Sequence, residues 1–205
     1  MSNSVIDSLL SRATTNLYDP AATLSDEQIR ELVGIATTAP TSFNFQNWRF
    51  VAVRTPEAKA RLRKISWDQP KITDAAVTFI ICGQLIDYSL LRQRLEPAEA
   101  AGIMSAQMVA GWEGAARVLY SEQPQRQRDE AVRTGAIGAT ALIYAAHALG
   151  LGSTPMIGFD ADAVACDFAL AEDEVPVMLL SIGKALSGNW PQKPRRPVSE
   201  VLDFV

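Results

Sequence analysis

A long stretch without charged side chains limits what this chain can fold into. No Asp, Glu, Lys or Arg occurs from Thr134 to Gly152, and a stretch of this kind is typical of a membrane span or of a buried helix. It is rich in Ala and Gly and contains Thr140, Tyr144 and His147, so it is too weakly apolar for a membrane span. We therefore expect a helix buried in a protein core.

The composition indicates an ordinary globular protein. The chain has 205 residues, of which 48% are hydrophobic and 20% charged, and a core of that size is stable without disulfides. The formal net charge of -4 argues against nucleic acid as the main partner. Met1 to Asp7 lacks the basic start and the apolar core of a signal peptide. With no membrane span expected, we predict a cytoplasmic protein.

Cysteine and histidine provide no obvious metal site. Cys82 and Cys166 are far apart in the sequence, and both lie in apolar surroundings, where a cysteine is usually buried. His147 is the single histidine, so we predict a hydrogen-bonded residue of the core or of an interface, and no metal. A Gly-x-Ser-x-Gly elbow is absent, and no Gly-x-Gly-x-x-Gly follows a strand. Hydrolase and dinucleotide-fold interpretations are therefore poor.

Local signals predict an alternation of helices and strands. The predicted helices cover Val5 to Leu10, a segment opened by the capping box Ser25 to Gln28, Thr55 to Ile65, Ala98 to Tyr120 and Asp129 to Leu149. The predicted strands are Phe50 to Val53, Val77 to Cys82 and Val175 to Ile182. Residues 121–128 and 151–159 are predicted as loops, and Asp160 as the cap of another helix.

The two long predicted helices carry many small residues. Gly102, Gly111 and Gly114 lie in the first, and Gly135 and Gly138 in the second. A glycine inside a helix costs about 1 kcal/mol relative to alanine, so we expect backbones to approach closely there. The close approach could be between the two helices or between two copies of the chain in a dimer.

A polar connection between a helix and a strand is the first candidate binding segment. Pro40 ends the helix, and Thr41, Ser42, Asn44 and Gln46 follow with hydroxyl and amide groups that both donate and accept hydrogen bonds. Such a set suits the edge of a flat heteroaromatic ring. A capped turn with aromatic anchors remains the alternative.

Positively charged residues near both ends of the chain are the second candidate. Arg12, Thr14 and Asn16 alternate, so in an extended segment they share one side and could clamp a phosphate. After the last strand, a proline-rich basic segment with Lys193 and Arg195 predicts an extended arm. The alternative for the first group is a solvated loop. Lys71 could likewise face an anion or simply be exposed.

Five blocks in the same order resemble the FMN-dependent nitroreductase family over nearly the whole chain. They are residues 12–16, 39–50, 73–75, 155–160 and 193–197. The resemblance implies an α+β sandwich with a central, mostly antiparallel sheet flanked by helices. It implies a single FMN-binding domain over residues 1–185 and a C-terminal arm, residues 186–205, that wraps the partner subunit of a homodimer.

The resemblance also implies a cofactor site built from several segments, with the flavin at the dimer interface. Its residues would be Arg12, Ala13, Thr14, Asn16, Pro40, Thr41, Ser42, Asn44, Gln69, Lys71, Pro155, Met156, Ile157, Gly158, Lys193 and Arg195. The cations at both chain ends would hold the phosphate, and Lys71 would stabilise negative charge on the reduced flavin. Two residues depart from the family pattern, because Asn16 stands where a basic residue is frequent and Ile157 where Glu is common.

The implied activity is the reduction of nitroaromatic or quinone-type acceptors by NADH or NADPH. Turnover would be ping-pong, with hydride passing through the flavin N5, so no side chain is expected to be catalytic. Phe43, Phe45 and Trp67 are candidate pocket walls, with core packing as the alternative. Two other functions stay open. One is a flavin-binding or regulatory dimer with little turnover, and the other is dehalogenation or flavin cleavage on the same scaffold.

Overall fold

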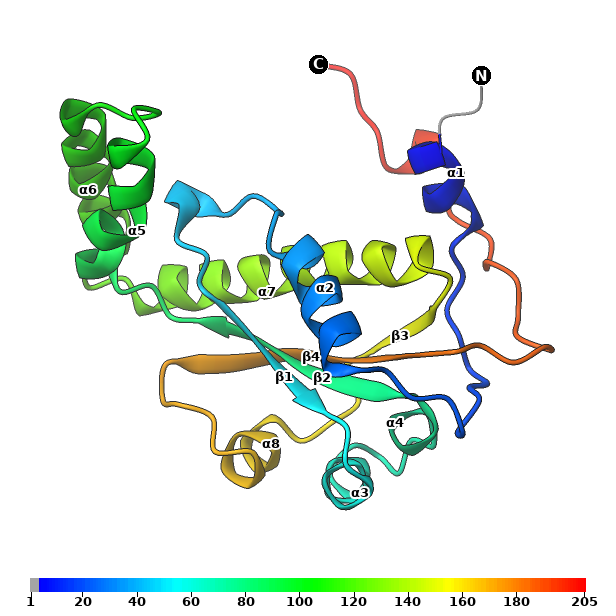
Figure 1. Cartoon of the computed structure of the whole chain (residues 1–205). Coiled ribbons are helices and arrows are strands. Elements are labelled where there is room, and N and C mark those ends of the chain that lie inside the picture. Colours follow the sequence, from blue (N-terminus) through cyan, green and yellow to red (C-terminus); the bar gives the residue numbers. More distant parts are fainter. Residues whose placement is uncertain (1–3) are drawn as a thin grey trace.

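A four-stranded antiparallel sheet forms the centre of the protein (Figure 1). The structure of the protein is a computed structural model that describes residues 4–205. The first three residues of the predicted domain lie outside the described residues. The strands are β1 (Trp48–Val53), β2 (Val77–Gln84), β3 (Gly152–Met156) and β4 (Glu174–Gly183). Their order is β1-β2-β4-β3, and each neighbouring pair is antiparallel. The prediction of a mostly antiparallel sheet is confirmed.

Residues 4–205 form eight α-helices, not all of which lie against the sheet (Figure 1). They are α1 (Ser4–Ser11), α2 (Asp26–Ala36), α3 (Pro56–Lys64), α4 (Lys71–Asp74), α5 (Leu91–Ala100), α6 (Ala106–Tyr120), α7 (Pro124–Ala148) and α8 (Ala161–Asp167). Short 3-10 turns occur at Ser42–Asn44, Tyr88–Leu90 and Val198–Glu200. Among the described residues, none of these helices combines the length and the apolar character that a membrane span requires.

Both faces of the sheet are covered, which makes the fold an α+β sandwich as predicted. Val77, Phe79 and Ile81 of β2 pack against α2 and α7, whereas Ile80 and Cys82 pack against α3, α4 and α8. This alternation follows from the two-residue period of a strand, and it explains why β2 is buried almost along its whole length and largely apolar. Figure 1 shows α7 lying along one face, with α3 and α8 on the other.

Local signals at several helix starts are confirmed. Ser25 and Gln28 form both bonds of a capping box at α2. Thr55 caps α3 and Pro56 takes its first position, where the missing N–H costs nothing. The Asp160 side chain accepts a hydrogen bond of 3.0 Å from the Ala163 N–H at the start of α8.

The prediction of one helix from Ala98 to Tyr120 is wrong. The chain breaks between α5 and α6, where Gly102 adopts a φ of 70° and Ser105 caps the new helix. A positive φ ends a right-handed helix, and glycine adopts it without steric cost. The spacing of small and apolar residues that predicted one helix therefore runs across Gly102, although the backbone turns there and separates α5 from α6.

Two predicted loops are partly regular structure. Residues 121–128 were expected to form a solvated turn, but α7 already begins at Pro124, which occupies its first turn. Residues 151–159 contain β3, whose register with β4 pairs Ser153 with Ile182. Pro155 argued against a strand in the sequence, because proline is rare inside sheets. It is tolerated here because β3 is an edge strand.

The glycines of α7 allow this helix to approach the sheet closely, and they do not face α6. A Cβ on Gly135 would lie 2.7 Å from Cγ2 of Val177, and one on Gly138 would lie 3.1 Å from the Phe50 ring. A Cβ on Gly111 or Gly114 of α6 would meet nothing within 4 Å in this chain. Close packing of the two helices against each other is thus not the reason for these glycines.

The outcome for cysteine and histidine is mixed. Cys82 is buried, and burial raises the pKa of its thiol to about 12, but Cys166 is exposed on α8, contrary to the prediction. A seven-residue surface helix has only one buried face, and Cys166 lies off it. His147 is half-buried and its Nε2 lies 2.9 Å from Oγ of Ser11, so the predicted hydrogen bond is present.

The close contact of β2 with α7 gives a test of this packing. A Cβ added at Gly83 would lie 1.8 Å from the carbonyl oxygen of Ala131, which is backbone and cannot rotate away. We expect Gly83→Ala to lower the free energy of unfolding by about 3 kcal/mol, measured by chemical denaturation.

The matched control is Gly34→Ala in α2, where a Cβ meets nothing within 4 Å. It should stabilise the protein by up to about 1 kcal/mol. Equal stability of the two variants would contradict the packing of α7 on β2.

Candidate functional site

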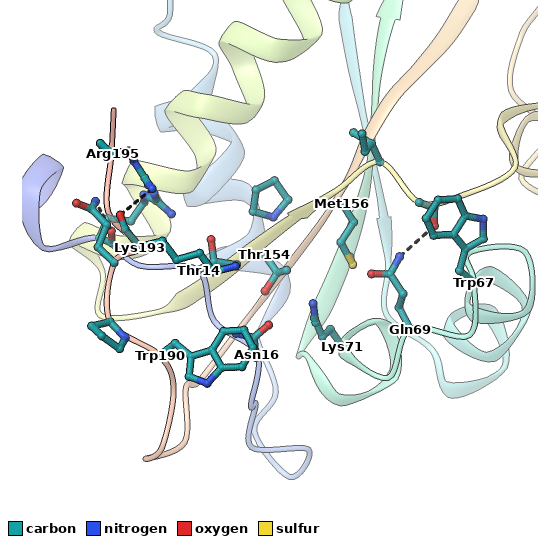
Figure 2. A pocket seen from close by; sticks show the side chains of 16 residues that line it. Thr14, Asn16, Trp67, Gln69, Lys71, Thr154, Met156, Trp190, Lys193 and Arg195 are labelled. Carbon is teal, nitrogen blue, oxygen red and sulfur yellow. Dashed lines mark hydrogen bonds between the residues drawn. The ribbon is translucent and has the colours of Figure 1, made fainter. Parts of the chain in front are cut away.

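A pocket of about 300 Å³ lies where a segment after α1 and a segment of the C-terminal arm meet the edge of the sheet (Figure 2). Four segments surround it: the residues after α1, the turn into α4, the end of β3 with the loop after it, and the C-terminal arm. Its lining residues are Arg12, Thr14, Asn16, Trp67, Gln69, Lys71, Thr154, Pro155, Met156, Ile157, Gly158, Trp190, Pro191, Gln192, Lys193 and Arg195.

The N-terminal segment presents alternate side chains to the pocket. Arg12, Thr14 and Asn16 line it, whereas Thr15 points the other way and is buried. The segment is held in an extended form by the edge of the sheet, since the N–H of Thr15 donates to the carbonyl of Ser153 at 3.0 Å. The predicted shared side of Arg12, Thr14 and Asn16 is confirmed.

The C-terminal arm reaches the same place by running beside the N-terminal segment. Asp19 N–H donates to the carbonyl of Lys184 at 2.9 Å, and Leu186 N–H donates to that of Leu17 at 3.0 Å. Residues 190–205 then continue without helix or strand apart from one 3-10 turn, as expected for an extended arm. Figure 2 shows Lys193 and Arg195 beside Thr14.

The charges around the pocket are of one sign. Arg12, Lys71, Lys193 and Arg195 line it, no Asp or Glu does, and residues 4–205 offer none of the four an ion-pair partner. Nζ of Lys193 lies 5.3 Å from the centre of the Trp190 ring, and the Arg195 guanidinium donates to the carbonyl of Lys193 at 2.9 Å. In a protein of net charge -4, such a group favours an anionic ligand.

The opposite end of the pocket combines amides with apolar surface. Nε2 of Gln69 donates to the carbonyl of Gly158 at 3.0 Å, which ties the turn before α4 to the loop after β3. Trp67 packs on Gly158 but stays 80% exposed, and Ile157 is 82% exposed. Trp67 and Asp68 both have a φ of 50°, so this turn is held in a backbone form that non-glycine residues seldom adopt.

Helix α3 fixes the segment that carries Lys71. Nζ of Lys59 donates to the carbonyl of Thr73 at 3.2 Å and also to that of Ala75, at the C-terminal end of α4. Nε of Arg63 donates to the Asp68 carboxylate at 2.7 Å. Burial lowers the pKa of Lys59, although the carboxylate of Asp74 opposes that shift.

The polar loop at Pro40 does not contribute to the pocket of its own chain. Pro40, Thr41, Ser42 and Asn44 do not line the pocket, and neither does Ala13. Oγ of Ser42 lies 2.9 Å from the Tyr120 hydroxyl of α6, and Phe45 is buried against the same ring at 5.9 Å between centroids. A single chain therefore brings together only part of the predicted set. Phe45 and partly buried Phe43 are packing residues, whereas Trp67 lines the pocket.

Four pocket residues were not predicted as part of the site: Thr154, Trp190, Pro191 and Gln192. Trp190, Pro191 and Gln192 belong to the arm, whose prolines and charges predict only that it is extended and basic. Thr154 lies in the unpredicted β3, and its hydroxyl lies 2.7 Å from that of Tyr18. Burial raises the pKa of Tyr18, so this phenol stays neutral inside the protein. The sequence signal that could have identified Trp190 is a tryptophan within a polar, proline-rich segment. The structure shows that this side chain is exposed.

Comparison with known proteins gives a consistent result. The model described as the Nitroreductase family matches residues 9–184. YodC of Bacillus subtilis (strain 168), which carries the name of an NAD(P)H nitroreductase, is 31% identical over 200 residues, or 98% of each chain. Protein DrgA of Synechocystis sp. is 33% identical over 181 residues, covering 87% of this chain and 82% of its own.

A solved structure extends this likeness to the fold. The crystal structure of an Exiguobacterium sibiricum protein, described as a nitroreductase in complex with FMN, has a TM-score of 0.90 and 26% identity. It covers 100% of this chain and 99% of its own. The predicted enzyme class and cofactor agree with these names, and the chain belongs to the nitroreductase family.

Proposed function

We propose that the protein is an FMN-dependent NAD(P)H oxidoreductase that reduces nitroaromatic or quinone-type acceptors. The observation that carries this proposal is the pocket with four cations and no carboxylate, built by segments from both ends of the chain. YodC carries an NAD(P)H nitroreductase name, and the Exiguobacterium protein binds FMN according to its description. The predicted cytoplasmic location stays a prediction.

The residues at one end of the pocket fit a phosphate group. Arg12, Lys193 and Arg195 would hold the dianion by charge-assisted hydrogen bonds, and the Thr14 hydroxyl would add a neutral one. Asn16 would contribute an amide in place of the basic residue that is frequent in the family. The unpaired charges support this assignment, because cations without carboxylates bind an anion at little cost in competing ion pairs.

The residues at the other end fit a flat heteroaromatic ring. The side-chain oxygen of Gln69 accepts no hydrogen bond from residues 4–205, and Lys71 would place an ammonium near the ring. FMN, when bound, would supply the hydride chemistry, accepting from NAD(P)H and giving to the acceptor. Pro155, Met156, Ile157 and Gly158 would cover one side of the ring, and the exposed Trp67 would border the acceptor.

A homodimer would supply the rest of the site. Pro40, Thr41, Ser42 and Asn44 lie away from the pocket of their own chain, so they would reach the flavin only in the partner's site. The open face of α6 around Gly111 and Gly114 supports a partner there. The last residues of the arm, beyond Arg195, would contact the partner subunit.

Reduction by nicotinamide cofactors separates this function from its alternatives. Flavin absorbance of the FMN-loaded protein should bleach under anaerobic NADH or NADPH and return after a quinone is added. Bleaching that a quinone cannot reverse would favour another flavin reaction. Flavin that neither nicotinamide bleaches would favour the binding-only dimer, motivated by Asn16 and Ile157. Protein that cannot be loaded with FMN would reject the proposal.

Replacement of Arg195 tests the phosphate end. Arg195→Ala should weaken FMN binding by about 1.5–3 kcal/mol, because it removes a charged hydrogen-bond donor. The matched control is Arg196→Ala, since Arg196 does not line the pocket and pairs with Glu200 at 3.0 Å. Both dissociation constants can be measured by flavin fluorescence. Equal effects would mean that only the overall charge of the arm matters.

Replacement of Lys71 tests the ring end. Lys71→Met keeps the length of the side chain but removes its charge, so the reduced, negatively charged flavin should lose stabilisation. We expect the midpoint potential of bound FMN to fall by an amount on the order of 30 mV, measured by dye-coupled titration. An unchanged potential would place the ammonium away from the ring.

A further inference from the structure

The side chain of Asn189 connects the C-terminal arm to the N-terminal segment. Its Oδ1 accepts hydrogen bonds from the N–H of Asn16 at 2.6 Å and from that of Leu17 at 2.9 Å. Its Nδ2 donates to the carbonyl of Leu17 at 3.0 Å and to that of Leu186 at 2.9 Å. One amide therefore bonds to four backbone groups on both segments.

These bonds use the whole hydrogen-bonding capacity of an asparagine. Its amide offers two donors and an oxygen with two lone pairs, and each has a backbone partner here. Serine and alanine cannot reproduce this set, and aspartate has no donor for the two carbonyls. Gly188, with a φ of 90°, provides the turn that directs the next side chain back onto the N-terminal segment.

Among the described residues, one other hydrogen bond ties the arm beyond this point to another segment. Nε2 of Gln192 donates to the carbonyl of Arg12 at 3.0 Å. Within residues 4–205, every other hydrogen bond or ion pair of residues 190–205 joins two residues of the arm itself, such as Arg196 with Glu200. The place of Lys193 and Arg195 at the pocket thus depends on Asn189 and Gln192.

The N-terminal side of the same contact carries the other phosphate ligands. Asn16, whose N–H binds Asn189, lines the pocket with its own side chain, and so does Arg12, whose carbonyl binds Gln192. Repulsion between the cations of the two segments opposes their approach when no anion is bound. Neutral amide bonds can hold the two segments together without adding a carboxylate that would compete with the ligand.

We propose that Asn189 is a positioning residue for the phosphate end of the pocket, with Gln192 as its second contact. It touches neither phosphate nor flavin in this role, and it acts by fixing the arm that carries Lys193 and Arg195. This inference rests on the proposed FMN function. It predicts that loss of the Asn189 amide weakens recognition of the phosphate and leaves recognition of the ring unchanged.

Comparison of FMN with riboflavin tests this role, since riboflavin has the same ring and no phosphate. Dissociation constants of both are measured by fluorescence for the wild type, Asn189→Ala, Gln192→Ala and the control Gln125→Ala. Gln125 lies at the start of α7, away from the pocket, and its side-chain amide donates to the Asp129 carboxylate of the same helix at 2.7 Å. We expect Asn189→Ala to weaken FMN binding about tenfold, Gln192→Ala less, and riboflavin binding to stay within about twofold.

Each other outcome has a defined meaning. An equal loss of FMN and riboflavin binding, or no loss of either, in folded Asn189→Ala would overturn the positioning role. If that variant does not fold, Gln192→Ala gives the same comparison with a single bond removed. Wild-type protein that binds neither flavin would instead refute the proposed function, and with it this inference.

Discussion

The mutual repulsion of unpaired cations is the constraint on which the rest of the site depends. Arg12, Lys193 and Arg195 come from opposite ends of the sequence and meet at one pocket that no carboxylate lines. Like charges in such a place raise the free energy of the folded protein until an anion binds. Backbone pairing between residues 17–19 and 184–186, and the amides of Asn189 and Gln192, hold them together meanwhile.

The sheet makes this convergence geometrically possible. Because β3 lies at the edge, its outer side is free to pair with Thr14 and Thr15, and β4 leads directly into the arm. Helix α4 precedes β2 and is held by Lys59 from α3, so Lys71 faces the same pocket from the other side. Ligand recognition is thus assembled around a rigid frame whose two faces are buried by helices.

Sequence reasoning succeeded where the signal is short-range. The alternation of Arg12, Thr14 and Asn16 has the period of an extended chain, and the structure places all three on the pocket side. Gln69, Lys71 and the segment from Pro155 to Gly158 also line the pocket. Lys71 was a candidate from the sequence alone, whereas the flavin contacts of the other residues came from family resemblance. The loop at Pro40 shows the limit of such reasoning, because its side chains face α6 in their own chain.

The sequence by itself determined the chemistry and the local frame. It supplied the cations, the helix caps at Ser25, Thr55 and Asp160, and the apolar strands, all of which depend on neighbours a few residues apart. Only the tertiary structure decided where β3 forms and which backbone groups Asn189 binds. The first depends on pairing with β4 and with Thr14, and the second on a segment near the opposite end of the sequence. No local periodicity records which distant edge a segment will meet.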